Sequence, residues 1–165
     1  MKELWQLIKM LFSSKLGDFD TPKLLPMKHY PFKGYRFIMW CGRMIYRAEN
    51  KENIDRYMQT YAGKESLTHE TIHLRQAQVT GSWVKYYWRY FVEWIKGNPI
   101  CYPASSAYYT IKYEMEAYAN ENNPNYPANY TGNNLSRYKI KGGRKKLYKS
   151  VGGTSKAWKT YIRTL

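Results

Sequence analysis

The chain has few acidic residues, and their distribution limits the sites it can build. It holds 12 Asp and Glu against 27 Lys and Arg in 165 residues, which gives a formal net charge of +15. No aspartate and no histidine follows His73, and residues 136–165 contain ten Lys or Arg and no acid. After residue 73 the chain therefore offers no imidazole, and any carboxylate that a site takes from there must belong to a glutamate.

Cysteine is scarce, and long apolar runs are lacking. Cys41 and Cys101 form no CxxC pattern and could make one bridge at most, so we expect free core thiols in a reducing compartment. Residues 1–17 have neither a continuous apolar segment nor a small-residue cleavage site, and no stretch reaches the length of a membrane span. These absences predict a soluble protein that is cytoplasmic at the place where it is synthesised.

The length suits one compact domain, and the apolar patterns predict a mainly helical α+β fold. A short antiparallel pair of strands is expected on either side of Gly42, within residues 35–47. Helices are expected over residues 52–61 with a stop at Gly63, from Ser66 or Thr68 to Gly81, over 82–96, over 106–120, and within 156–165.

The N-terminal residues form a separate amphipathic pattern. Apolar side chains recur at helical spacing at Leu4, Leu7, Ile8, Leu11 and Phe12, and Gly17 ends the pattern. A stripe of this kind usually faces a core, and docking on a partner or a membrane is its alternative use. The helix and its connector are expected to occupy residues 1–26.

The stretch "SLTHETIHLRQ" carries the clearest chemical motif, His69-Glu70-x-x-His73. Two histidines four residues apart lie on one helix face about 6 Å apart, so both imidazoles can bind one zinc ion. Glu70 is then placed beside the ion, where it can take a proton from an attacking water. The alternative is a surface helix with two solvated histidines.

A catalytic zinc needs a third protein ligand and an open fourth position. Downstream of His73 the only candidates are four glutamates, namely Glu93, Glu114, Glu116 and Glu121. Residues 114 and 116 point to different faces of a helix, so at most one of them can reach the metal.

A resemblance narrows this choice. HExxH followed by E-x-E-A on a second helix resembles the gluzincin clan of zinc peptidases. Together with "HYPFKGYRFI", these motifs are similar to small gluzincin-like proteins of Bacteroidetes bacteria and their phages, over about residues 27–125. The resemblance implies that Glu116 is the third zinc ligand, Glu114 its exposed neighbour and Gln76 a supporting residue.

The resemblance also implies a peptidase mechanism. Glu70 would be the catalytic base, the strand at residues 35–40 would lie along the substrate, and Tyr109, Tyr113 or Tyr118 would stabilise the oxyanion. One departure concerns the carboxylate that many gluzincins place shortly after the ligand glutamate to orient a zinc histidine. Tyr118 and Asn120 stand at those offsets here.

Residues 126–165 are a basic, tyrosine-rich tail. Such a tail suits an anionic partner, and the alternative is a solvated, disordered segment. The competing function is therefore a phage virion or assembly protein that keeps the zinc-peptidase fold, with the tail bound to neighbouring proteins or to nucleic acid. No nucleic-acid-binding module is recognisable in the sequence.

Overall fold

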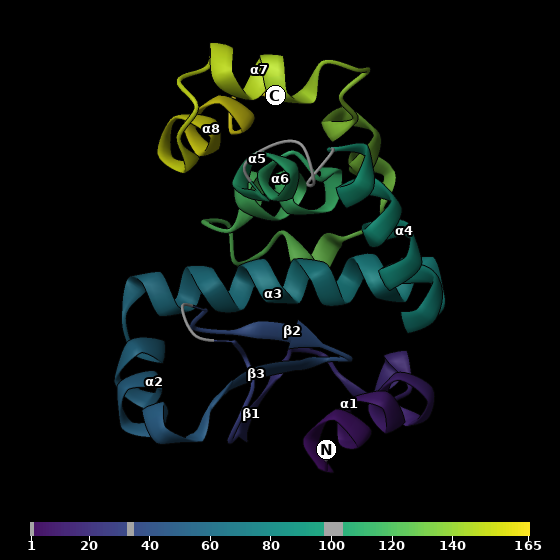
Figure 1. The fold of residues 1–165 in the computed structure, drawn as a ribbon, viewed down its shortest axis with the longest axis vertical. Coiled ribbons are helices and arrows are strands. Elements are labelled where there is room, and N and C mark those ends of the chain that lie inside the picture. Colours follow the sequence, from purple (N-terminus) through teal and green to yellow (C-terminus); the bar gives the residue numbers. More distant parts are fainter. Residues whose placement is uncertain (1, 33–34, 98–103) are drawn as a thin grey trace.

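The computed structural model describes residues 2–32, 35–97 and 104–165. Helix α3 (Tyr61–Thr80) crosses the middle of the molecule and separates two groups of elements (Figure 1). On one side lie three strands and two helices: β1 (Lys23–Met27), β2 (Ile38–Trp40), β3 (Arg43–Arg47), α1 (Lys2–Ser13) and α2 (Lys51–Met58). The other side contains α4 (Trp83–Lys96), α5 (Ala104–Tyr109), α6 (Lys112–Asn120), α7 (Arg144–Ser150) and α8 (Ser155–Ile162). The fold is thus mainly helical with a small mixed sheet, as the α+β prediction required.

The sheet has the order β1-β3-β2. The predicted antiparallel pair is confirmed as β2 and β3, joined by a tight turn in which Cys41 and Gly42 have φ angles of 47° and 79°. Strand β1 pairs in parallel with β3 and was not predicted. Its sequence, KLLPM, contains a proline, which is tolerated here because β1 is an edge strand.

Helix α3 begins earlier than predicted. Thr60 is its N-cap and accepts a hydrogen bond from the Gly63 backbone N–H at 3.1 Å, so Ser66 and Thr68 lie inside the helix. Gly63 is not a stop, because it lies in the first turn against the end of α2. A Cβ at Gly63 would lie 2.1 Å from the backbone oxygen of Tyr57. Gly81, with φ of 80°, ends the helix as predicted.

The predicted helix over 82–96 is confirmed as α4, capped by Ser82, but its apolar face is not the buried one. Trp83 and Tyr86 face the core together with Glu93. Four large apolar side chains of the helix are exposed instead: Val84, Trp88, Phe91 and Ile95. In α1 the stripe is split, since Leu7 and Leu11 pack on the core and the other members are exposed.

The helix expected over 106–120 is broken. Ile111 has extended backbone angles and precedes the first turn of α6, so α5 and α6 are separate helices. The break changes the direction of the chain just before Glu114 and Glu116.

The basic tail is folded. Tyr148, Trp158 and Ile162 pack with Met115 of α6 in a second buried cluster. The short helix predicted within 156–165 is α8. The tail is therefore part of the structure around α6.

Cys41 is buried and free, and burial raises the pKa of its thiol to about 12. The prediction for Cys101 falls outside the described residues. Among the helices that are described, none combines the length and the apolar character needed to cross a membrane.

Candidate metal centre

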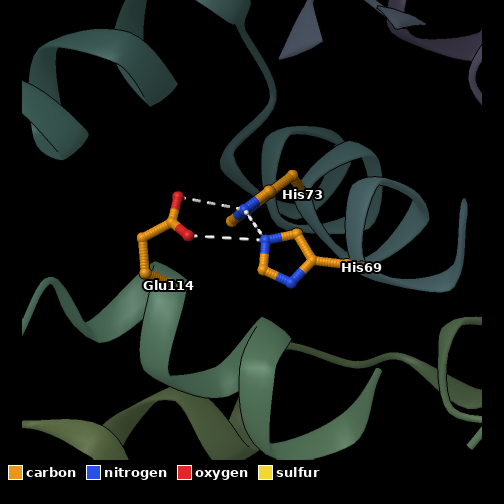
Figure 2. A group of neighbouring side chains, drawn as sticks. All are labelled: His69, His73 and Glu114. Carbon is orange, nitrogen blue, oxygen red and sulfur yellow. Dashed lines mark hydrogen bonds and ion pairs between the residues drawn. The ribbon is translucent and has the colours of Figure 1, made fainter. Parts of the chain in front are cut away.

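Helix α3 brings the two histidines of the motif together. His69 and His73 are both buried, and their Nε2 atoms lie 3.1 Å apart. Glu114 reaches the pair from α6, as Figure 2 shows. Its Oε1 lies 3.2 Å from Nε2 of His73, and its Oε2 lies 3.4 Å from Nε2 of His69.

These spacings match a metal coordination shell. Ligand atoms at about 2.0–2.1 Å from a tetrahedral zinc ion lie about 3.3–3.4 Å from one another. The two Nε2 atoms lie 3.1 Å apart, and each has a different Glu114 oxygen beside it, at 3.2 and 3.4 Å, so the separations are close to this spacing. Two imidazole nitrogens and a carboxylate oxygen are also ligands that zinc accepts. The three residues therefore fit one divalent cation.

Glu114, and not Glu116, accompanies the imidazoles. Glu114 was expected to be an exposed neighbour, yet it is only 3% exposed. Glu116, the ligand expected from the resemblance, is fully buried on another face of α6, where its carboxylate accepts hydrogen bonds from Gln76, Tyr126 and Tyr130. Only one of the two reaches the pair, as the helix geometry predicted.

A chain of hydrogen bonds fixes the tautomer of His73. The Gln76 side-chain amide donates to the Tyr113 carbonyl at 3.0 Å and to Glu116 Oε2 at 2.9 Å. Because both partners are acceptors, the amide nitrogen of Gln76 must face them. Gln76 Oε1 therefore faces His73 Nδ1 at 2.8 Å and accepts its proton. The Nε2 lone pair of His73 is left pointing at the site.

Glu116 acts through this chain. Its carboxylate holds the Gln76 amide in place, and the hydroxyls of Tyr126 and Tyr130 donate to it at 3.0 and 2.9 Å. Gln76 thus has the supporting place that the resemblance implied. Glu116 is linked to the His73 imidazole through Gln76, and not directly.

His69 has a different partner. Its Nδ1 lies 3.2 Å from Oε2 of Glu121, a carboxylate seven residues after Glu114. Oε1 of Glu121 is paired with Lys159 at 3.2 Å and with Arg163 at 3.1 Å, both from the basic tail. The carboxylate that seemed to be missing after the ligand glutamate is therefore Glu121.

Tyr118 and Asn120 have other contacts. The Tyr118 ring packs against the His69 ring with centroids 4.3 Å apart. The Asn120 side chain donates to the Glu116 backbone oxygen and to the Tyr138 hydroxyl. Neither replaces a carboxylate.

The electrostatics of the cluster favour cations. Burial alone would lower the pKa of His69, but the Glu114 and Glu121 carboxylates raise it to about 10. Burial opposes the charge on Glu114, but His73 and His69 hold the pKa of Glu114 well below its usual range. The site therefore attracts positive charge strongly, and a metal ion must compete with protons for the imidazoles.

Glu70 lines a cavity of about 420 Å³ next to the cluster. Its Oε2 is buried and has no hydrogen-bond partner among the described residues, and burial raises the pKa of its carboxyl group. His73 and Glu114 line the same cavity. An unpaired buried carboxylate oxygen beside three potential ligands is placed to hold a water molecule and accept its proton.

The tyrosines expected to stabilise an oxyanion do not line this cavity, although Tyr118 packs on His69. Tyr109, Tyr113 and Tyr118 are not among the described residues that line the cavity. Five other tyrosines line it: Tyr35, Tyr86, Tyr87, Tyr90 and Tyr108. Tyr90 donates to Glu114 Oε1 at 2.7 Å, so it steadies a candidate ligand. With 18 tyrosines in the chain, no sequence signal separates these five from the rest.

Glu93, the remaining ligand candidate, is also accounted for. Its carboxylate forms ion pairs with Lys96 of α4 and with Arg144 of α7. It is a link between α4 and the tail.

Comparison of the chain with protein-family models, with curated proteins and with solved structures found no match.

Proposed function

We propose that the protein is a zinc-dependent peptidase of gluzincin-like fold, with His69, His73 and Glu114 as zinc ligands. The observation that carries the proposal is the convergence of the two Nε2 atoms and the Glu114 carboxylate, at separations of 3.1 to 3.4 Å that are close to the spacing of zinc ligand atoms. The two Nδ1 atoms face Glu121 and Gln76, which leaves both Nε2 lone pairs directed at the same point.

Three protein ligands leave one coordination position for water or substrate, which is the arrangement of a catalytic rather than a structural site. When bound, zinc supplies Lewis-acid chemistry and lowers the pKa of a water molecule that reaches it. Glu70 would accept the proton of a water molecule in the cavity as the water oxygen adds to the peptide carbonyl. Glu70 then returns the proton to the amine that leaves as the C–N bond breaks.

The cavity favours a peptide with an apolar side chain. Much of its wall is aromatic or aliphatic, including Phe37, Ile38 and Trp40, and none of its described lining residues is Lys or Arg. Strand β2 supplies part of this wall and lies at an edge of the sheet. An extended substrate backbone can pair with an edge strand of this kind.

The test combines metal analysis with hydrolysis of a peptide library. We expect about one zinc per chain in the wild type and in Glu70→Gln, because Glu70 is not a ligand. Hydrolysis should fall about 10²- to 10⁴-fold in Glu70→Gln, since the proton acceptor is lost. Cleavage should occur beside apolar residues.

Glu65→Gln, a change in the same helix five residues earlier, is the matched control and should leave both zinc and activity unchanged. A wild-type protein that binds no zinc after reconstitution would refute the proposal. Zinc binding without any hydrolysis would refute the peptidase activity and leave the metal site.

A further inference from the structure

Helix α1 turns large apolar side chains toward solvent. Phe12 is 77% exposed and Trp5 is 61% exposed, although the opposite side of the helix is packed on the core. The exposed apolar set is Leu4, Trp5, Ile8 and Phe12. Contiguous exposed apolar side chains on a folded protein mark a contact surface.

Lysines alternate with the aromatic residues on this face. Lys2, Trp5, Lys9 and Phe12 follow one another at intervals of three or four residues, so they form one ridge along the helix. Both lysines are exposed. The acid of this helix, Glu3, is bound to the backbone N–H groups of Lys28 and His29 at 2.6 and 2.9 Å. The exposed ridge is therefore positive as well as apolar.

We propose that α1 docks the protein on an anionic lipid bilayer. An amphipathic helix with Lys beside Trp and Phe sinks its apolar side into the headgroup region while the ammonium groups bind anionic lipid. The surrounding sequence is positively charged, which complements anionic lipid: residues 1–36 contain seven Lys or Arg against three acids. Helix α4 contacts α1 and exposes a second apolar stripe, from Val84 to Ile95.

The test is co-sedimentation of the full chain with vesicles of phosphatidylcholine, with and without phosphatidylglycerol. The wild type should bind the anionic vesicles more strongly than the neutral ones. Trp5→Ser/Phe12→Ser should lower the partition coefficient about tenfold or more, because two membrane-embedded side chains are lost. The control Tyr61→Ser removes an equally exposed aromatic residue from α3 and should have no effect.

A second pair of variants separates local charge from net charge. Lys2→Gln/Lys9→Gln should weaken binding to anionic vesicles more than Lys146→Gln/Lys149→Gln, which lowers the net charge equally. Circular dichroism checks that each variant is folded. The proposal fails if the wild type binds neither vesicle, or if the α1 variants bind as the wild type does. It also fails if the wild type is a dimer that Trp5→Ser/Phe12→Ser makes monomeric, since the face would then bind a second copy.

A separate set of contacts links the C-terminal helix to the metal centre. Lys159 lies 3.2 Å from Glu121 Oε1, and its ammonium group also lies 3.9 Å from the centroid of the Tyr118 ring. Glu121 and the Tyr118 ring both contact His69. Trp158, the residue before Lys159, is fully buried and donates to the Tyr109 carbonyl at 2.7 Å.

We infer that Lys159 and Arg163 are positioning residues for His69. Without their positive charges, Glu121 would turn toward solvent and leave Nδ1 of His69 without its acceptor. This inference rests on the proposed metal site, and it adds that the tail sets the affinity of that site. Loss of a group that orients a zinc histidine typically lowers metal affinity about 10- to 100-fold. Because the two cations act through Glu121, we expect about a 3- to 10-fold loss.

The experiment measures zinc affinity and the absorption spectrum of bound Co²⁺ in Lys159→Met/Arg163→Met. The matched control, Lys149→Met/Lys156→Met, removes two tail cations that are not among the described ion-pair partners of Glu121. The positioning variant should bind zinc more weakly and shift the Co²⁺ spectrum, and Lys159→Arg alone should keep both at the wild-type values. Wild-type affinity in the double variant would refute the inference while leaving the zinc site intact. Absence of metal in the wild type would refute the site itself.

Discussion

The two histidines of the site are supported from different parts of the molecule and by different chemistry. His73 is held by Gln76, a neutral, buried amide that Glu116 and the Tyr113 backbone fix in place. His69 is held by Glu121, an ionised group whose charge is balanced by the partly exposed Lys159 and Arg163. One support belongs to the interior, and the other depends on a surface ion-pair cluster. The comparison indicates that the His73 side is rigid and that the His69 side is adjustable.

The largest effect should come from the carboxylate that both histidines share. Glu114→Gln removes a charged ligand, so we expect zinc affinity to fall by at least about 100-fold. Glu116→Gln should keep zinc bound with a smaller loss, since Glu116 acts through Gln76. Isothermal titration of the metal-free proteins measures both. Equal losses in the two variants would show that Glu114 is not a direct ligand.

The next effect compares the two supports directly. Gln76→Leu removes the acceptor of His73 and leaves the Glu116 carboxylate without its amide donor, so we expect a 10- to 100-fold loss of zinc affinity. Glu121→Gln keeps an acceptor for His69 and should cost less, about tenfold. Titrations under identical conditions test the order. A larger loss for Glu121→Gln would reverse the ranking of the two sides.

Salt should weaken the support of His69 by Glu121 and leave the support of His73 by Gln76 unchanged. Raising the ionic strength screens the pairs that the buried Glu121 makes with Lys159 and Arg163, because both cations are partly exposed. We expect high salt to lower zinc affinity about two- to threefold in the wild type and less in Lys159→Met/Arg163→Met. Titrations at low and high potassium chloride compare the two proteins. The same salt dependence in both would show that the tail cations do not act on the site.

The smallest effect concerns how the tail is attached. Burial opposes the charge of Glu93, but Lys96 and Arg144 together lower the pKa of its carboxyl group below 4.5. A lowered pKa in the folded state means that Glu93 stabilises the protein above the unfolded-state value, and that this stability is lost as the pH falls through the folded-state value. Denaturant unfolding of the metal-free wild type and Glu93→Gln should therefore show a difference at pH 7 that shrinks below pH 4.5. A difference that stays constant with pH would assign the effect of the substitution to packing.

The sequence predicted the elements that local signals define. The HExxH spacing identified His69, His73 and Glu70, and Gly81 and Ser82 marked the end of α3 and the start of α4. The hairpin at Gly42 was equally clear. Strand β1 was missed because a short, proline-containing edge strand depends on pairing with β3, which is distant in the sequence.

The carboxylate beside the imidazoles was harder to predict because E-x-E presents two carboxylates on one helix. Which of them reaches the imidazoles depends on the rotation of α6, and that rotation depends on the break at Ile111 and on the packing of Met115 against the tail. Glu121 was missed as the partner of His69 for a related reason. It lies just beyond the end of α6, and its charge partners come from residues that the sequence left as a tail.

The ion pairs of Glu121 also bear on the order in which the protein matures. During translation, α3 emerges before α8, so the hydrogen bond between His73 and Gln76, both on α3, can form while α8 has still to be made. The acceptor of His69 gains its counter-charges only when Lys159 and Arg163 arrive. A nascent chain would therefore carry a half-organised candidate metal centre until the later part of synthesis.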